Sequence, residues 1–142
     1  MMENLVLHIP NKIEALHSLH RSLSELGRAW KLNKDVQMNT ELVLEEIVSN
    51  IIFYAFEDEE EHIIEISIER VDNEMIIRIT DDGKPFDITA AESLHDASKP
   101  AEEREIGGLG VYFVKTLMDK IAYLRVDGRN ILTLYKNIKH KA

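Results

Sequence analysis

The stretch IIEISIERVDNEMIIRIT, residues 63–80, decides the fold of this chain. Apolar and polar side chains alternate along Ile63–Val71 and again along Met75–Thr80, which is the pattern of strands with one buried face. Asp72 and Asn73 lie between the two runs, and residues of this kind favour a tight turn. The stretch therefore predicts an antiparallel β-hairpin.

The segment before this hairpin predicts two helices. Apolar residues recur at helical spacing from Asn11 to about Leu32, with Asn11 as the cap and Gly27 as an interruption or end. A second helix is expected from about Asp35 to Phe56, and an acidic run then leads into the hairpin.

Further strands are predicted near both ends of the chain. Leu5–Ile9 stops at Pro10 and fits a short edge strand. After the hairpin, helical spacing returns at Leu109–Met118, and Ile121–Val126 and Ile131–Tyr135 are strand candidates joined through residues 127–130. This order predicts an α+β two-layer sandwich, in which helices cover one face of a mostly antiparallel sheet.

The length and composition fit a single domain, residues 1–142. The formal net charge of −9 argues against non-specific binding to nucleic acid or to an anionic membrane. The absence of cysteine excludes disulfides, cysteine-held metals and thiol nucleophiles. We find no secretory signal at the N-terminus and no apolar run of membrane length, so we expect a cytoplasmic protein.

Glu46 and Asn50 lie four residues apart in the second predicted helix, so their side chains share one face. That face borders the apolar stripe of the helix, where a carboxylate and a carboxamide can converge on a ligand in a cleft. Oxygen ligands of this kind bind Mg²⁺ alongside substrate phosphates. Taken alone, the pair is better explained as polar residues in contact with solvent.

Two further segments carry possible binding chemistry. DDGKPFD, residues 81–87, is first of all a turn signal, but a carboxylate at a strand end can also accept a hydrogen bond from an exocyclic amine such as that of adenine. GGLGVYFVK, residues 107–115, is a glycine-rich turn that opens into a helix. Its backbone N–H groups suit a phosphate, whereas the motif alone is equally typical of a flexible hinge.

Together and in this order, the three segments resemble the N box and the two glycine boxes of the GHKL (Bergerat-fold) ATPases. The motifs DDGKPFD and GGLGVYFVKTLMD, and the Leu132-Thr133-Leu134 strand, are similar to those of the stand-alone anti-sigma factor serine kinases. The resemblance extends over nearly the whole chain. It implies a histidine kinase-like ATPase domain, ATP and Mg²⁺ as cofactors, and protein serine/threonine kinase activity.

The resemblance also implies a role for each matching residue. Glu46 corresponds to an acid that acts as general base or orients the acceptor hydroxyl, and Asn50 to a Mg²⁺ ligand. Asp81 corresponds to the aspartate that reads adenine, and Gly83 to the glycine that lets the base lie against the backbone. The phosphate-contacting turn corresponds to Gly107, Gly108, Leu109 and Gly110. Thr133 corresponds to a hydroxyl residue near adenine, and residues 88–106 to an ATP lid. Arg104, just before the glycine turn, can reach the γ-phosphate or a partner, but as a single charge in a loop it is explained at least as well as a solvated residue.

The partners implied by the resemblance are proteins. A STAS-type anti-anti-sigma protein is the expected phosphoacceptor, a sigma factor is a second candidate partner, and a homodimer is a candidate assembly. The chain departs from the family pattern at Tyr54, where relatives often carry a histidine. An ATP-binding regulatory switch with little or no kinase activity is therefore the alternative function. A histidine-kinase catalytic domain is disfavoured, because about 40 residues before the N box cannot supply a two-helix phosphoacceptor module as well.

Overall fold

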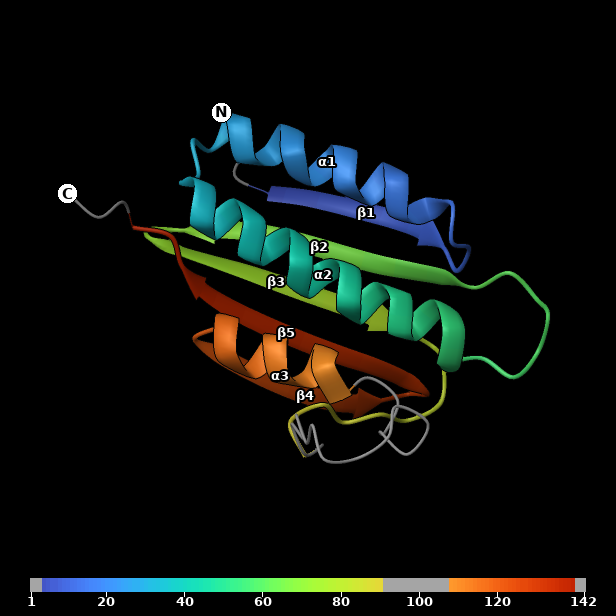
Figure 1. Ribbon diagram of the computed structural model, residues 1–142. Coiled ribbons are helices and arrows are strands. Elements are labelled where there is room, and N and C mark those ends of the chain that lie inside the picture. Colours follow the sequence, from blue (N-terminus) through green and yellow to red (C-terminus); the bar gives the residue numbers. More distant parts are fainter. Residues whose placement is uncertain (1–3, 91–107, 140–142) are drawn as a thin grey trace.

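In the computed structural model, which describes residues 4–90 and 108–139, three helices cover one face of a five-stranded sheet (Figure 1). The sheet order is β1-β2-β3-β5-β4, and all neighbouring strands are antiparallel. This architecture confirms the predicted α+β sandwich. The strands are β1 (Asn4–Pro10), β2 (Ile63–Val71), β3 (Glu74–Asp81), β4 (Lys120–Val126) and β5 (Arg129–Asn137).

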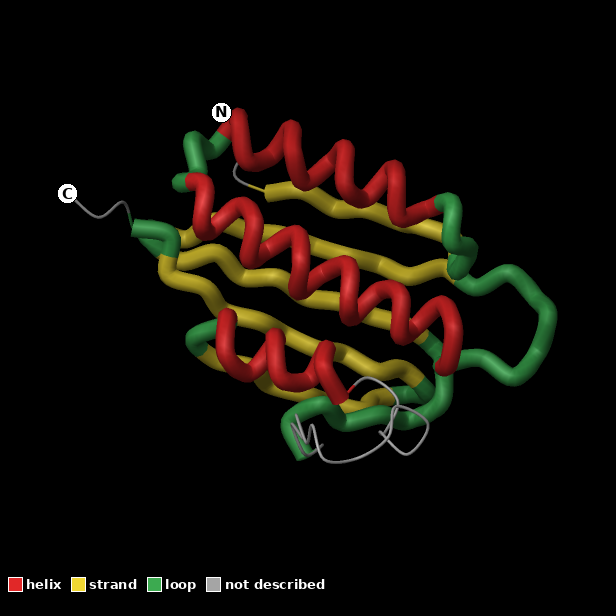
Figure 2. Tube along the Cα trace, viewed as in Figure 1, coloured by secondary structure: helices red, strands yellow, loops and turns green. Residues whose placement is uncertain are grey.

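The helices are α1 (Ala15–Ala29), α2 (Lys34–Tyr54) and α3 (Gly108–Leu117), and α2 crosses the middle of the sheet (Figures 1 and 2). Asn33 caps α2, because its side-chain oxygen accepts a hydrogen bond from the backbone N–H of Val36 at 3.0 Å. None of the described helices combines the length and the apolar composition that crossing a membrane requires.

The β2–β3 hairpin forms as its alternating pattern predicts. Val71 pairs with Glu74, and Asp72 adopts a positive φ of 55° in the turn between them. Every second side chain of the hairpin points toward the helices and is buried against α2. The apolar stripe of α2 belongs to the same core. This packing holds α2 firmly on the sheet. The core contacts come from Ile64, Ile66, Ile68, Met75, Ile77 and Ile79 of the hairpin and from Val43, Leu44, Ile47 and Val48 of α2.

The first helix does not begin at Asn11 as predicted. α1 starts at Ala15, and Asn11 instead joins the start of β2. The backbone N–H of Asn11 donates to the carbonyl of His62 at 2.9 Å, and the Asn11 side-chain oxygen accepts from the His62 N–H at 2.8 Å. The local sequence suited a helix cap, but a contact with a residue 51 positions away uses the side chain.

The prediction that Gly27 interrupts or ends the first helix is also wrong, because α1 continues through it to Ala29. A Cβ atom at Gly27 would lie 1.7 Å from Oε1 of Gln37 on α2. The side-chain amide of Gln37 donates to the carbonyl of Leu23 at 2.9 Å and thereby fastens the two helices together. Gly27 therefore serves helix packing rather than helix termination.

The β4–β5 connection is shorter than the predicted four-residue link. Asp127 and Gly128 both have positive φ angles, of 51° and 76°, as a two-residue hairpin turn requires. Val126 consequently pairs with Arg129, and Asn130 belongs to β5 opposite Asp81. This register brings Asn130 to the end of β3, where the candidate site lies.

Candidate functional site

A cavity of about 320 Å³ lies between the C-terminal part of α2, the end of β3 with the loop that follows, and strands β4 and β5. Its walls are mainly aliphatic and aromatic, with a few polar groups, and this combination is typical of sites for small organic ligands. The lining residues are Ile47, Asn50, Ile51, Tyr54, Ala55, Ile79, Asp81, Lys84, Pro85, Phe86, Ile88, Tyr123, Asn130 and Leu132.

Asp81 is the acidic group of this cavity. It is 6% exposed, and among the residues that the structure describes it is the only ionisable one that is buried. Its Oδ1 accepts hydrogen bonds from the backbone N–H of Gly83 at 2.9 Å and from Nδ2 of Asn130 at 3.1 Å. Burial raises the pKa of the Asp81 carboxyl, and the bonds from Asn130 and Gly83 act in the opposite direction. Both bonds fall on Oδ1, so within residues 4–90 and 108–139 no hydrogen bond occupies Oδ2.

Gly83 lets the loop after β3 pass close to the end of α2. A Cβ atom at this position would lie 2.6 Å from the Cβ of Ala55 and 2.7 Å from its carbonyl oxygen. The same carbonyl accepts a hydrogen bond from the backbone N–H of Lys84 at 2.9 Å. Glycine is therefore needed here for a close approach of two backbone segments that both line the cavity.

We expect Gly83→Ala to lower the free energy of unfolding by about 1–3 kcal/mol, because the added methyl group meets a backbone atom. Urea unfolding measures the change. Gly128→Asn is a suitable control, since a Cβ at Gly128 meets nothing within 4 Å and asparagine tolerates a positive φ. Equal stability of the two variants would contradict the packing role assigned to Gly83.

Asn130 uses its whole side-chain amide to connect β5 with its surroundings. Nδ2 donates to Asp81 and also to the carbonyl of Lys84 at 2.9 Å. Oδ1 accepts from the backbone N–H of Phe86 at 3.3 Å and from the hydroxyl of Tyr123. Sequence reasoning missed this residue, because its neighbours Asp127 and Gly128 made it look like part of a turn.

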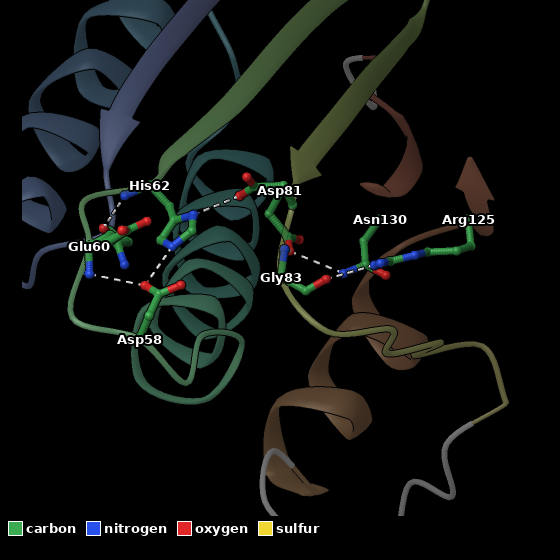
Figure 3. Close-up of polar contacts among 9 residues, drawn as sticks. Asp58, Glu60, His62, Asp81, Gly83, Arg125 and Asn130 are labelled. Carbon is green, nitrogen blue, oxygen red and sulfur yellow. Dashed lines mark hydrogen bonds and ion pairs between the residues drawn. The ribbon is translucent and has the colours of Figure 1, made fainter. Parts of the chain in front are cut away.

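Arg125 of β4 is a second site residue that the sequence did not reveal. Its guanidinium donates to the carbonyl of Gly83 at 2.7 Å, across 42 residues of sequence. Figure 3 shows Arg125 and Asn130 approaching the Asp81–Gly83 segment from neighbouring strands. The loop after β3 is thus held both by its own strand and by the β4–β5 hairpin.

Glu46, Asn50 and Gly110 come together where α3 meets α2. A Cβ atom at Gly110 would lie 3.2 Å from Oε2 of Glu46 and 3.3 Å from Nδ2 of Asn50. The absence of a side chain at Gly110 therefore lets the first turn of α3 approach both polar groups. Asn50 also lines the cavity, so it connects the Asp81 region with the start of α3.

The remaining glycine-box residues are only partly described. Gly108 and Leu109 form the start of α3. Gly107 and Arg104 lie outside the described residues, as does most of the predicted lid, residues 88–106. Of that lid segment, Ile88 is buried and lines the cavity.

Thr133 is not brought to the cavity, in contrast to its predicted place near adenine. It pairs with Arg78 of β3, while Leu132 on one side of it lines the cavity. Because side chains alternate along a strand, Thr133 points to the opposite face of the sheet from Leu132. The position opposite Asp81 is filled by Asn130, three residues earlier.

His62 joins the acidic loop after α2 to the residue beside Asp81 (Figure 3). Its Nε2 lies 2.8 Å from Oδ1 of Asp58 and its Nδ1 lies 3.1 Å from Oδ1 of Asp82. The ring stacks on Phe56, with 4.0 Å between the centroids. The hydrogen bond with Asp58 raises the pKa of His62 and lowers the pKa of Asp58.

We expect His62→Gln to lower the melting temperature by about 1–4 °C, most strongly between pH 3.8 and 6.5, the ordinary pKa values of Asp58 and His62. The stabilisation by His62 is full below its ordinary pKa and is lost as pH rises through its raised pKa. The stabilisation by Asp58 is lost as pH falls through the lowered pKa of Asp58. Thermal unfolding across pH tests this, with the exposed His17→Gln on α1 as control. An effect independent of pH would contradict the charged pair.

Comparison with known proteins identifies the family. Residues 9–136 match the model of the histidine kinase-like ATPase domain. The serine-protein kinase RsbW of Listeria monocytogenes serovar 1/2a is 27% identical over 143 aligned positions, covering 98% of this chain and 91% of the relative. The serine-protein kinase RsbW of Halalkalibacterium halodurans is 28% identical over 137 positions, covering 94% and 83%.

Solved structures show the same fold. The RsbU and RsbW domains of Rv1364c from Mycobacterium tuberculosis superpose with a TM-score of 0.69 at 14% identity over 97% of this chain, which spans 34% of that structure. The blue-light activated histidine kinase EL346 of Erythrobacter litoralis superposes with a TM-score of 0.56 at 15% identity, covering 75% of this chain and 32% of that one. The RsbW serine-protein kinases are thus similar to this chain over nearly its whole length, and the chain belongs to the histidine kinase-like ATPase domain family.

Proposed function

We propose that this chain is an ATP- and Mg²⁺-dependent protein serine/threonine kinase that regulates a partner by binding and by phosphorylating a STAS-type anti-anti-sigma protein. One observation carries the proposal: Asn50 lines the cavity that holds Asp81 and also lies against the start of α3 beside Glu46. A nucleobase pocket, a candidate metal ligand, a helix N-terminus and a base are therefore contiguous along one side of α2.

The cavity suits the nucleoside part of ATP. Its apolar walls favour an aromatic base, and the buried Asp81 offers Oδ2 as acceptor for an exocyclic amine. Gly83 keeps the neighbouring backbone close to that carboxylate. In this assignment Asn130, rather than Thr133, is the polar residue next to the base-reading aspartate.

The residues at the α2–α3 contact fit a bound magnesium ion. A carboxylate and a carboxamide oxygen are ligands that Mg²⁺ accepts, and Gly110 leaves space beside both side chains. Asn50 would hold the ion, and the N-terminus of α3 would face the phosphates. When bound, Mg²⁺ supplies positive charge that balances the phosphate groups.

Glu46 is the proposed general base. Its carboxylate accepts the proton of a serine or threonine hydroxyl as that oxygen attacks the γ-phosphorus and the bond from the γ-phosphorus to the β–γ bridging oxygen breaks. The rest of the contribution is positional, because α2 holds Glu46 and Asn50 on one rigid face. The name of the RsbW relatives, serine-protein kinase, supports a hydroxyl acceptor.

The alternative is an ATP-binding switch with little or no transfer activity. It is favoured by Tyr54, which lines the cavity at the end of α2, and by the lack of any basic residue in the last turn of that helix. A sigma factor as sequestered partner is compatible with either function, and so is a homodimer.

One experiment separates the two functions. The protein is mixed with Mg-ATP and candidate STAS proteins from its own genome, and phosphoserine or phosphothreonine is sought by mass spectrometry. Transfer that requires Glu46 supports the kinase. Binding of ATP with no transfer to any candidate supports the switch, and failure to bind ATP overturns both.

A further inference from the structure

The orientation of the Asn130 amide is fixed by two backbone groups. The carbonyl of Lys84 can only accept, so it faces Nδ2, and the N–H of Phe86 can only donate, so it faces Oδ1. Nδ2 of Asn130 therefore presents a donor to Oδ1 of Asp81 at 3.1 Å. This bond requires that Oδ1 carries no proton.

A proton on the Asp81 carboxyl group would consequently sit on Oδ2. Oδ1 is excluded because it already accepts from both Asn130 and the N–H of Gly83. Oδ2 is the atom available to a ligand, and a protonated Oδ2 donates a hydrogen bond instead of accepting one. Burial of the carboxyl raises its pKa and favours this proton, whereas the bond from Asn130 disfavours it.

We propose that Asn130 is a positioning residue that holds Asp81 as an ionised acceptor for the exocyclic amine of a nucleobase. The proposal rests on the proposed binding of ATP in this cavity. Asn130 is 6% exposed and its amide has donors and acceptors on both sides, so its donor to Asp81 is held in place. Hydrogen bonds that fix a supporting side chain in this way orient a binding group before the ligand arrives.

The charged side chains near Asp81 do not replace this contact. Arg125 favours the ionised carboxylate, but its guanidinium donates its hydrogen bond to the carbonyl of Gly83. Asp82 disfavours the ionised form, and its own carboxylate is bonded to His62. The charged groups around the carboxylate are thus Asp82 on the same segment, Arg125 on β4, His62 before β2, and the Lys84–Glu57 ion pair in the two adjoining loops.

The test is the pH dependence of Mg-ATP affinity for Asn130→Ala, measured by calorimetry between about pH 5.5 and about pH 8. We expect the affinity ratio of wild type to variant to grow by about tenfold as pH falls over this range, because the variant protonates Asp81 sooner. Because protonation of the nucleotide changes the affinity of both proteins equally, its effect disappears from the ratio. Asn137→Ala, on the exposed far end of the same strand, is the matched control. A ratio that is the same at every pH would overturn the proposal, because it indicates a purely structural role.

Carboxyl ¹³C NMR of the nucleotide-free protein gives an independent readout. The Asp81 titration midpoint is expected at higher pH in Asn130→Ala than in wild type, and Asn130→Ser, which keeps one donor, is expected between them. In wild type, the Nδ2 resonance of Asn130 should titrate together with the Asp81 carboxyl, and this holds even if neither variant folds. Independent titration overturns the proposal. If wild type does not bind Mg-ATP, the proposed function fails, and the NMR titration still decides the role of Asn130.

Discussion

Glu46→Gln is expected to slow phosphate transfer to a serine or threonine acceptor by about 10²–10⁴-fold while Mg-ATP still binds. The substitution keeps the shape of the side chain and removes the group that accepts the hydroxyl proton. Because Glu46 borders Gly110 and does not line the cavity, the proposed nucleobase contacts are expected to stay intact. Single-turnover transfer measures the first effect, and calorimetry measures the second.

Glu45→Gln is the matched control for this prediction. Glu45 is the neighbouring residue on α2, carries the same charge and is exposed, so its replacement should leave the transfer rate close to that of wild type. Transfer by Glu46→Gln at the wild-type rate would remove the residue from the role of base. Loss of ATP binding in this variant would instead indicate that Glu46 holds the nucleotide or its metal.

Asp81→Asn is expected to weaken Mg-ATP binding by roughly 10- to 100-fold and at the same time to stabilise the nucleotide-free protein. Asparagine keeps an Oδ1 that accepts from Gly83 and Asn130, but it turns Oδ2 into a donor that opposes an exocyclic amine. It also removes a buried charge. Since burial raises the pKa of Asp81, the ionised form destabilises the fold at neutral pH, and this effect disappears below the ordinary pKa of 3.8.

Thermal unfolding and calorimetry at several pH values test both parts. The gain in melting temperature should be largest near neutral pH and should shrink as pH falls. Asp127→Asn is the control, because this exposed carboxylate lies in the β4–β5 turn and does not line the cavity, and asparagine tolerates its positive φ of 51°. A loss of stability at neutral pH together with unchanged ATP affinity would contradict the assignment of Asp81 as the base-reading residue.

The regular elements were predictable because their patterns are local. Alternation along residues 63–80 identified the central hairpin, and the broad apolar stripe of α2 identified the helix that covers it. The errors occurred where a distant residue determines the outcome. Gly27 lies within a helix because Gln37 fills the space beside it, and Asn11 bonds to His62 rather than capping α1.

In the candidate site, too, residues placed by a local pattern were predicted and residues placed by distant contacts were not. Glu46 and Asn50 share a face by helical spacing, and a glycine-rich helix start at Gly110 was readable from its composition. Asn130 and Arg125 could not be identified from the sequence. Only the register of β5 with β3 and of β4 with β5 brings them to the loop after β3. The same register turns Thr133 away from the cavity, which no local pattern indicates.

The pairing of β3 with β5 has a consequence for the folding of the chain. Asp81 and Asn130 are 49 residues apart in sequence, and the cavity takes its walls from three separate segments. A chain in which β5 has not yet paired with β3 has no complete pocket. A ligand that binds in the pocket therefore stabilises the state in which β5 is paired with β3. At 100 times its dissociation constant, such a ligand adds about 2.7 kcal/mol to the free energy of unfolding. Under the proposed function, the supply of nucleotide would therefore set how long the protein survives proteolysis as well as how fast it acts.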